Sequence, residues 1–134
     1  MSRQESRHPE DWLSKARQDL ARVRVLLNAD DPEGAGFHLQ QAVEKSLKAC
    51  LLLHDVIPRR IHDLSILLDD VLLYQPGLER FRDLCELSTG FYIPQRYPFL
   101  AIPAPTKEEV RTLLAQAQEL LEAIQARPAP TPGR

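Results

Sequence analysis

Apolar residues recur at three- and four-residue spacing over several long stretches of the chain, which is the period of helices with one buried face. The first stretch begins after Pro9, a residue that suits the first turn of a helix, and Glu10 and Asp11 follow where the helix dipole favours negative charge. It stops near Asn28, before the polar segment ADDPEGAG. The spacing predicts a helix over 9–28, with a buried face of Trp12, Leu13, Ala16, Leu20, Val23 and Leu27.

A second helix is predicted from Pro32 to about Leu53. Its first turns contain Gly34 and Gly36, and because glycine costs helix stability we expect both to allow close packing against a neighbouring backbone. One side of this helix is largely apolar and should face the core. That side consists of Leu39, Ala42, Val43, Ser46, Leu47, Cys50 and Leu53.

The rest of the chain carries clear signals for helix ends. Asp63 is a good N-cap for a short, very apolar helix, LSILLDDVLLY. The Pro-Gly pair at 76–77 interrupts the chain, and a fourth piece, LERFRDLCELSTG, ends at Gly90. Thr106 and Glu109 form a capping box for the last helix, KEEVRTLLAQAQELLEAIQA.

These elements predict an all-α protein, an up-and-down four-helix bundle with an additional short helix. The 134 residues suffice for one domain, which we expect to cover 9–126. A flexible segment, 1–8, should precede it, and a disordered tail, RPAPTPGR at 127–134, should follow it. The connection FYIPQRYPFLAIPAP is long for a compact domain, and loops of this length are often functional.

Charge and cysteine content narrow the class of protein. The formal net charge of −2 provides no overall positive field for nucleic acid, so such binding would need a local patch. The segment MSRQESRHPEDW has no apolar run, so we expect it to be neither a signal peptide nor an anchor. No stretch approaches the about 20 apolar residues of a membrane span, and we expect a cytoplasmic location. Cys50 and Cys85 are predicted to be buried thiols in a reducing compartment. Cys50, His54 and His62 are too few and too loosely spaced for a metal site, and we expect neither a metal nor a cofactor.

Four polar residues of the second helix, His38, Gln41, Lys45 and Lys48, fall within a wedge of about 80° on one flank. Lysine and glutamine are ordinary surface residues of helices, so this strip could be a solvated flank. Alternatively, its two lysines supply the local positive potential that the whole protein lacks, and the strip meets a ligand or a second subunit.

The proline-rich loop offers a second set of candidates, Tyr92, Arg96 and Tyr97. An arginine between tyrosines could bind a phosphate while a ring stacks on a base. The structural alternative is that the tyrosines fill the end of the bundle and Arg96 pairs with an acidic neighbour. His62 and Asp63 are expected to cap the third helix.

Three segments in this order resemble the HEPN domain family of prokaryotes: FHLQQAVEKSLKACLL, then HDL at 62–64, then RYP at 96–98. The resemblance implies a short up-and-down bundle that commonly forms homodimers. It also implies two kinds of function. Many members work with a minimal nucleotidyltransferase as a toxin–antitoxin pair, and others are RNases that use an arginine followed by a histidine at the dimer cleft.

The sequence lacks one of the two residues that define the RNase pattern, the histidine. Arg96 is the counterpart of the family's arginine, but no histidine follows it, because His62 is the last histidine in the chain. Loss of a general acid or base typically costs 10²- to 10⁴-fold in rate. We therefore expect a nucleotide- or partner-binding domain that works with a minimal nucleotidyltransferase, and not an enzyme. Two alternatives are a metal-independent RNase toxin that uses Arg96 with His38 or His62, and a ligand-free dimerisation module.

Overall fold

The structure, a computed structural model, describes residues 5–93, 99–100 and 103–126. All regular structure in these ranges is helical, which confirms the predicted all-α class. None of the described helices combines the length and the apolarity of a membrane span.

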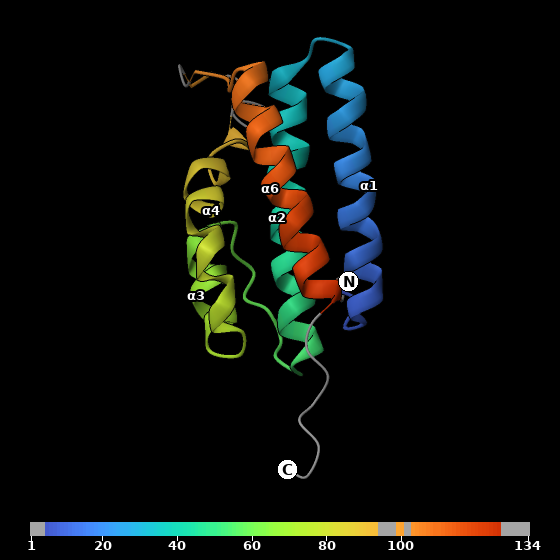
Figure 1. The fold of residues 1–134 in the computed structure, drawn as a ribbon, viewed down its shortest axis with the longest axis vertical. Coiled ribbons are helices and arrows are strands. Elements are labelled where there is room, and N and C mark those ends of the chain that lie inside the picture. The colour runs from blue at the N-terminus through green and yellow to red at the C-terminus, as the bar shows by residue number, and fades with distance from the viewer. Residues whose placement is uncertain (1–4, 94–98, 101–102, 127–134) are drawn as a thin grey trace.

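Three long helices run side by side along the molecule: α1 (Pro9–Asn28), α2 (Pro32–Leu53) and α6 (Lys107–Gln125) (Figure 1). The remaining side of the bundle is built from shorter pieces, α3 (Leu64–Leu72), a 3₁₀ helix η1 (Pro76–Phe81) and α4 (Arg82–Ser88). Helix α2 is the central element, because it contacts α1, α3, α4 and α6. Any polar side chain on α2 therefore lies close to another element.

The predicted core face of α2 is confirmed. Its residues are buried, except for Leu53, which is half-buried and packs against the core. Leu39 and Leu47 are fully excluded from solvent, and burying a leucine contributes roughly 1.5 to 3 kcal/mol. Because apolar residues of α1, α3, α4 and α6 join the same cluster, one core holds all these helices together.

The predicted helix starts are also confirmed. The Asp63 carboxylate accepts hydrogen bonds from the backbone N–H groups of Ser65 at 3.0 Å and Ile66 at 3.3 Å. Thr106 and Glu109 form the reciprocal capping box at the start of α6. These caps involve only neighbouring residues, so local sequence suffices to predict them.

The two glycines of α2 pack closely, but against side chains and not against the neighbouring backbone that we expected. A Cβ atom on Gly36 would lie 2.7 Å from Cγ of Pro105 and 3.3 Å from Cδ2 of Phe91. A Cβ atom on Gly34 would collide with the carboxylate of Asp31, which caps α2 by accepting from the Gly34 N–H. The absence of a side chain at Gly36 thus lets Phe91 and Pro105 pack against the start of α2.

The Pro-Gly pair at 76–77 has a different role from the predicted one. Pro76 is the first residue of η1, which continues directly into α4, so the pair begins the fourth piece. The fixed φ of proline suits a helical first turn, where no backbone N–H is needed. Helix α4 ends at Ser88, two residues before Gly90.

Both cysteines are buried thiols outside any disulfide, as expected. Burial raises the pKa of the Cys85 thiol to about 12, because the thiolate would lose its hydration inside the core. In the unfolded chain the pKa of this thiol is near 9. Between pH 9 and pH 12 the unfolded chain therefore releases the thiol proton while the folded chain keeps it, so folding becomes less favourable as the pH rises.

We predict that this thiol lowers the stability of the protein as the pH rises above 9. At pH 10 the contribution of the Cys85 thiol to the free energy of unfolding should be lower than at pH 8 by roughly 1.4 kcal/mol. The measurement is urea unfolding of the wild type and of Cys85→Ala at pH 8, 9 and 10. The difference in free energy of unfolding between the two proteins isolates the Cys85 thiol, because every other titrating group is present in both. A difference between the two proteins that stays constant over this range would contradict the prediction.

Candidate functional site

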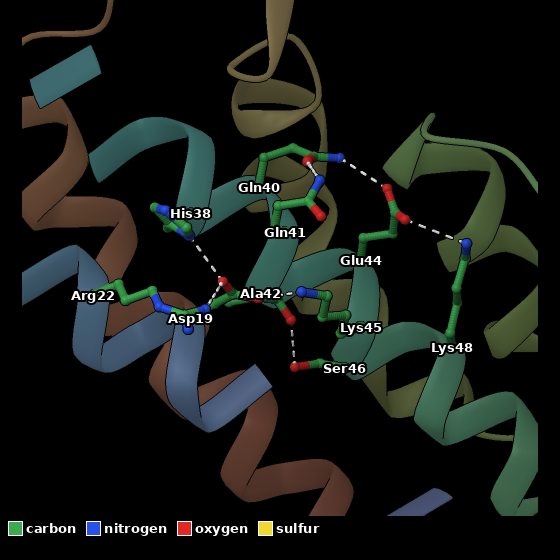
Figure 2. A network of polar contacts seen from close by, with 10 residues as sticks. All are labelled: Asp19, Arg22, His38, Gln40, Gln41, Ala42, Glu44, Lys45, Ser46 and Lys48. Atoms are coloured by element: carbon green, nitrogen blue, oxygen red, sulfur yellow. Dashed lines mark hydrogen bonds and ion pairs between the residues drawn. The ribbon is translucent and has the colours of Figure 1, made fainter. Parts of the chain in front are cut away.

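The polar strip of α2 is bound to carboxylates inside the protein (Figure 2). His38 Nδ1 lies 2.8 Å from Oδ1 of Asp19, and the Lys45 ammonium donates to Oδ2 of the same residue at 2.6 Å. Arg22 approaches Asp19 Oδ1 at 3.5 Å. We call Asp19, Arg22, His38 and Lys45 the Asp19 cluster, which joins α1 to α2.

Asp19 is only 1% exposed. It lies on the buried face of α1, three residues after Ala16 and four before Val23. A carboxylate in such a position is stable only when its charge is compensated, since the desolvation cost is several kcal/mol per ion. The Asp19 cluster provides this compensation from both helices.

A second carboxylate, Glu44, organises the other half of the strip. Lys48 Nζ lies 3.2 Å from Glu44 Oε2, and His62 Nδ1 lies 2.8 Å from Oε1. Gln40 donates to the same Oε1 at 3.1 Å. We call Glu44, Gln40, Lys48 and His62 the Glu44 cluster, and it joins α2 to the segment before α3.

The structure thus divides the predicted strip between two clusters. His38 and Lys45 belong to the Asp19 cluster and Lys48 to the Glu44 cluster, while Gln41 donates to Gln40 Oε1 at 2.7 Å. Lys48 is 3% exposed, which is incompatible with a solvated flank, and its ammonium lies 5.6 Å from the centre of the Trp12 ring. Trp12 itself is partly buried against the core, as expected of an anchor.

The His62 side chain does not cap α3, contrary to expectation; Asp63 does so, and Thr89 Oγ1 accepts from the N–H of Leu64 at 3.0 Å. The His62 side chain contacts Glu44 instead, because a buried carboxylate is a strong acceptor for a ring N–H, whereas the N-terminal N–H groups of α3 already have acceptors. Its ring also lies 5.4 Å from that of Tyr92, centre to centre. Tyr92 is therefore next to the Glu44 cluster, while Arg96 and Tyr97 lie outside the described residues.

The pair of Glu44 and His62 has a definite chemical capacity. The carboxylate holds one ring nitrogen, and the His62 side chain is still 53% exposed. A carboxylate that orients an imidazole in this way is the usual support for a general acid or base. No group of three or more His, Cys, Asp or Glu side chains suited to a metal occurs among the residues that the structure describes.

An open hollow of about 750 Å³ lies beside the Asp19 cluster. Trp12, Lys15 and Arg22 of α1 line it, together with Lys45 of α2. Its wall thus combines an aromatic ring with three cations, although Asp11 and Glu5 also contribute. Of the predicted site residues, Lys45 is the one that lines this hollow.

Sequence reasoning missed Asp19, Gln40 and Glu44. A signal for them was present, because each occupies a position in the apolar register of its helix, and an acidic or amide residue at such a position is the unusual observation. Which basic side chains reach them depends on how the helices pack, and that information is not local.

Comparison with known proteins places this geometry in a family. The HEPN domain matches residues 9–127. A protein of Methanocaldococcus jannaschii named "Putative toxin MJ1304" is 28% identical over 127 residues, which cover 84% of this chain and 83% of that protein.

Two crystal structures share the fold. That of TT1696 from Thermus thermophilus superposes with a TM-score of 0.76 at 30% identity, over 87% of this chain and 95% of the other. That of ST0689, an archaeal HEPN homologue, gives a TM-score of 0.68 at 26% identity, over 88% of this chain and 95% of the other. The resemblance carried by the second helix, HDL and RYP is confirmed, and the chain belongs to the HEPN domain family.

Proposed function

We propose that this chain is the nucleotide- or partner-binding component of a toxin–antitoxin-type system, and that it acts as a homodimer with a minimal nucleotidyltransferase. The similarity to "Putative toxin MJ1304" supports the toxin–antitoxin setting. The observation that carries the binding role is the hollow beside the Asp19 cluster, where an aromatic ring and three cations face one space.

The hollow suits a nucleotide for physical reasons. The Trp12 ring offers a face on which a base can stack, and Arg22, Lys15 and Lys45 offer charge for phosphates. Lys45 and Arg22 are already oriented by Asp19, so little of their side-chain freedom would be lost on binding. Lys15 forms no salt bridge with any residue in the described ranges, so its charge is available.

A second function, RNA cleavage without metal, is favoured by one observation. The Glu44–His62 pair supplies an oriented, half-exposed imidazole next to Tyr92, in a chain that has no histidine after Arg96. For this function His62 would move the proton of the ribose 2′-hydroxyl and Arg96 would stabilise the phosphate. The binding role remains the main proposal because the hollow joins an aromatic ring and three cations, whereas no histidine follows Arg96 in the sequence.

The first prediction concerns the Asp19 cluster as a joint between helices. Asp19→Asn removes the buried negative charge while keeping the shape, which leaves Lys45 and His38 without their counter-ion. We expect a loss of roughly 2 to 4 kcal/mol in the free energy of unfolding, measured in urea. The control is Asp30→Asn, which removes an exposed ion pair with Lys107 and should cost at most about 1 kcal/mol. Equal effects of the two substitutions would show that the Asp19 cluster does not hold α1 against α2.

The second prediction concerns nucleotide binding. Trp12 is the only tryptophan of the chain and lines the hollow, so its fluorescence can report on a ligand bound there, and Lys15→Ala tests whether the signal comes from the hollow. Titration with ATP should change this fluorescence saturably, and Lys15→Ala should weaken binding about tenfold. Lys107→Ala, on the exposed start of α6, is the matched control and should bind like the wild type. If no nucleotide changes the signal, the nucleotide role fails. The partner role is tested separately, by co-purification of the chain with a nucleotidyltransferase. The homodimer is tested by light scattering, where a strict monomer would exclude it.

The third prediction distinguishes the binding role from the RNase alternative. Under the main proposal, purified protein leaves RNA intact in the presence of EDTA, and His62→Ala changes nothing in that assay. Cleavage that resists EDTA and is lost both in His62→Ala and in Arg96→Ala, with both variants folded by circular dichroism, would establish the RNase function in its place.

A further inference from the structure

A second cavity, of about 490 Å³, lies away from the hollow and shares no lining residue with it. It is formed where the end of α2, the start of η1 and the end of α6 meet. Its size falls within the range of small-molecule sites. The lining comprises His54, Tyr74, Gln75, Pro76, Gly77, Leu78, Arg80 and Ala123.

One wall of this cavity is a pair of stacked rings. His54 and Tyr74 lie 5.2 Å apart, centre to centre, with an angle of 20° between their planes. The Gln75 amide nitrogen lies 3.1 Å from Nε2 of His54, which holds the imidazole in place. Tyr74 is 43% exposed although it is large and aromatic, so the stack offers a flat surface for a planar ligand.

Arg80 provides the charge of the cavity. Its guanidinium lies 4.4 Å from the centre of the Phe81 ring, and it forms no salt bridge within the described ranges. The neighbouring residue Glu79 is already engaged by another arginine. Glu79 and Asp69 both bind Arg82, whose hydrogen bond lowers the pKa of Glu79. A cation left without a counter-ion beside an aromatic wall suits an anion.

Gly77 lines the cavity and leaves empty space beside it. Its φ is not in the left-handed range, and a Cβ atom placed on it would meet nothing within 4 Å. Neither backbone conformation nor packing in this chain therefore requires glycine here, and alanine would favour a helical turn by up to about 1 kcal/mol. The missing side chain has one evident consequence, which is space in the cavity.

From these features we propose that the cavity binds a small planar aromatic anion. The ring of the ligand stacks on the Tyr74 and His54 pair, its anionic group pairs with Arg80, and Gly77 leaves room for the ring. Both a nucleoside monophosphate and an aromatic carboxylate have this chemistry. The proposal goes beyond the proposed function, because it concerns a different part of the molecule.

Isothermal titration calorimetry of the full chain tests it with four compounds: AMP, benzoate, adenosine and inorganic phosphate. We expect saturable binding of AMP or benzoate at millimolar concentrations, and which of the two binds identifies the source of the ligand. Adenosine, which lacks the charge, and phosphate, which lacks the ring, should bind at least about tenfold more weakly.

Three variants locate the site. Gly77→Leu should abolish binding without lowering the melting temperature, because its side chain enters open space. Arg80→Gln should weaken binding by about 10- to 100-fold, whereas Arg17→Gln, on the exposed face of α1, should leave it unchanged. The proposal is wrong if neither AMP nor benzoate binds, or if Gly77→Leu binds as well as the wild type. AMP binding that persists in Gly77→Leu and changes Trp12 fluorescence would assign the ligand to the hollow instead.

Discussion

The structure depends on the compensation of one buried charge, the Asp19 carboxylate between α1 and α2. Its partners come from both helices: the cation of Arg22 from α1, and the Lys45 ammonium and the His38 ring from α2. A shift of α1 by one turn along α2 would carry Asp19 away from Lys45 and leave a carboxylate buried without its counter-ion. The cost of such a state is several kcal/mol, so the cluster selects one register of the two longest helices, which apolar packing alone would specify less strictly.

The Glu44 cluster extends the same principle to the other side of α2. Through His62 it holds the segment before α3, and through the ring of His62 it meets Tyr92. The central helix α2 thus meets two buried acids, Asp19 of α1 and its own Glu44, and each acid joins α2 to a different neighbouring segment. The basic residues gain order from these contacts while His38, Lys45 and His62 remain partly exposed. Fixed cations and an oriented imidazole at a surface are features that binding or proton transfer requires, and in this member of the HEPN domain family both occur beside one central helix.

Much of the fold could be predicted because its signals are local. Pro9, Asp63 and the Thr106–Glu109 box mark helix starts through contacts within one turn, and the apolar period marks the buried faces. The candidate site was harder for a definite reason. Lys45 and Lys48 stand about one turn apart on the same flank, yet they bind different carboxylates, one on another helix and one on their own. Helical spacing shows that two side chains share a flank, but not which partner each one meets.

The sequence by itself determined the all-α class, the starts of α1, α2, α3 and α6, the core face of α2, the buried thiols and the family, since each depends on local pattern or on motifs in a set order. Only the tertiary structure decided that Asp19 and Glu44 are the centres of the polar strip, that His62 turns away from the α3 cap, and that Gly36 receives Pro105. The physical reason is that a buried charge takes its partner from whichever element packing brings within about 3 Å, and packing is a property of the whole chain.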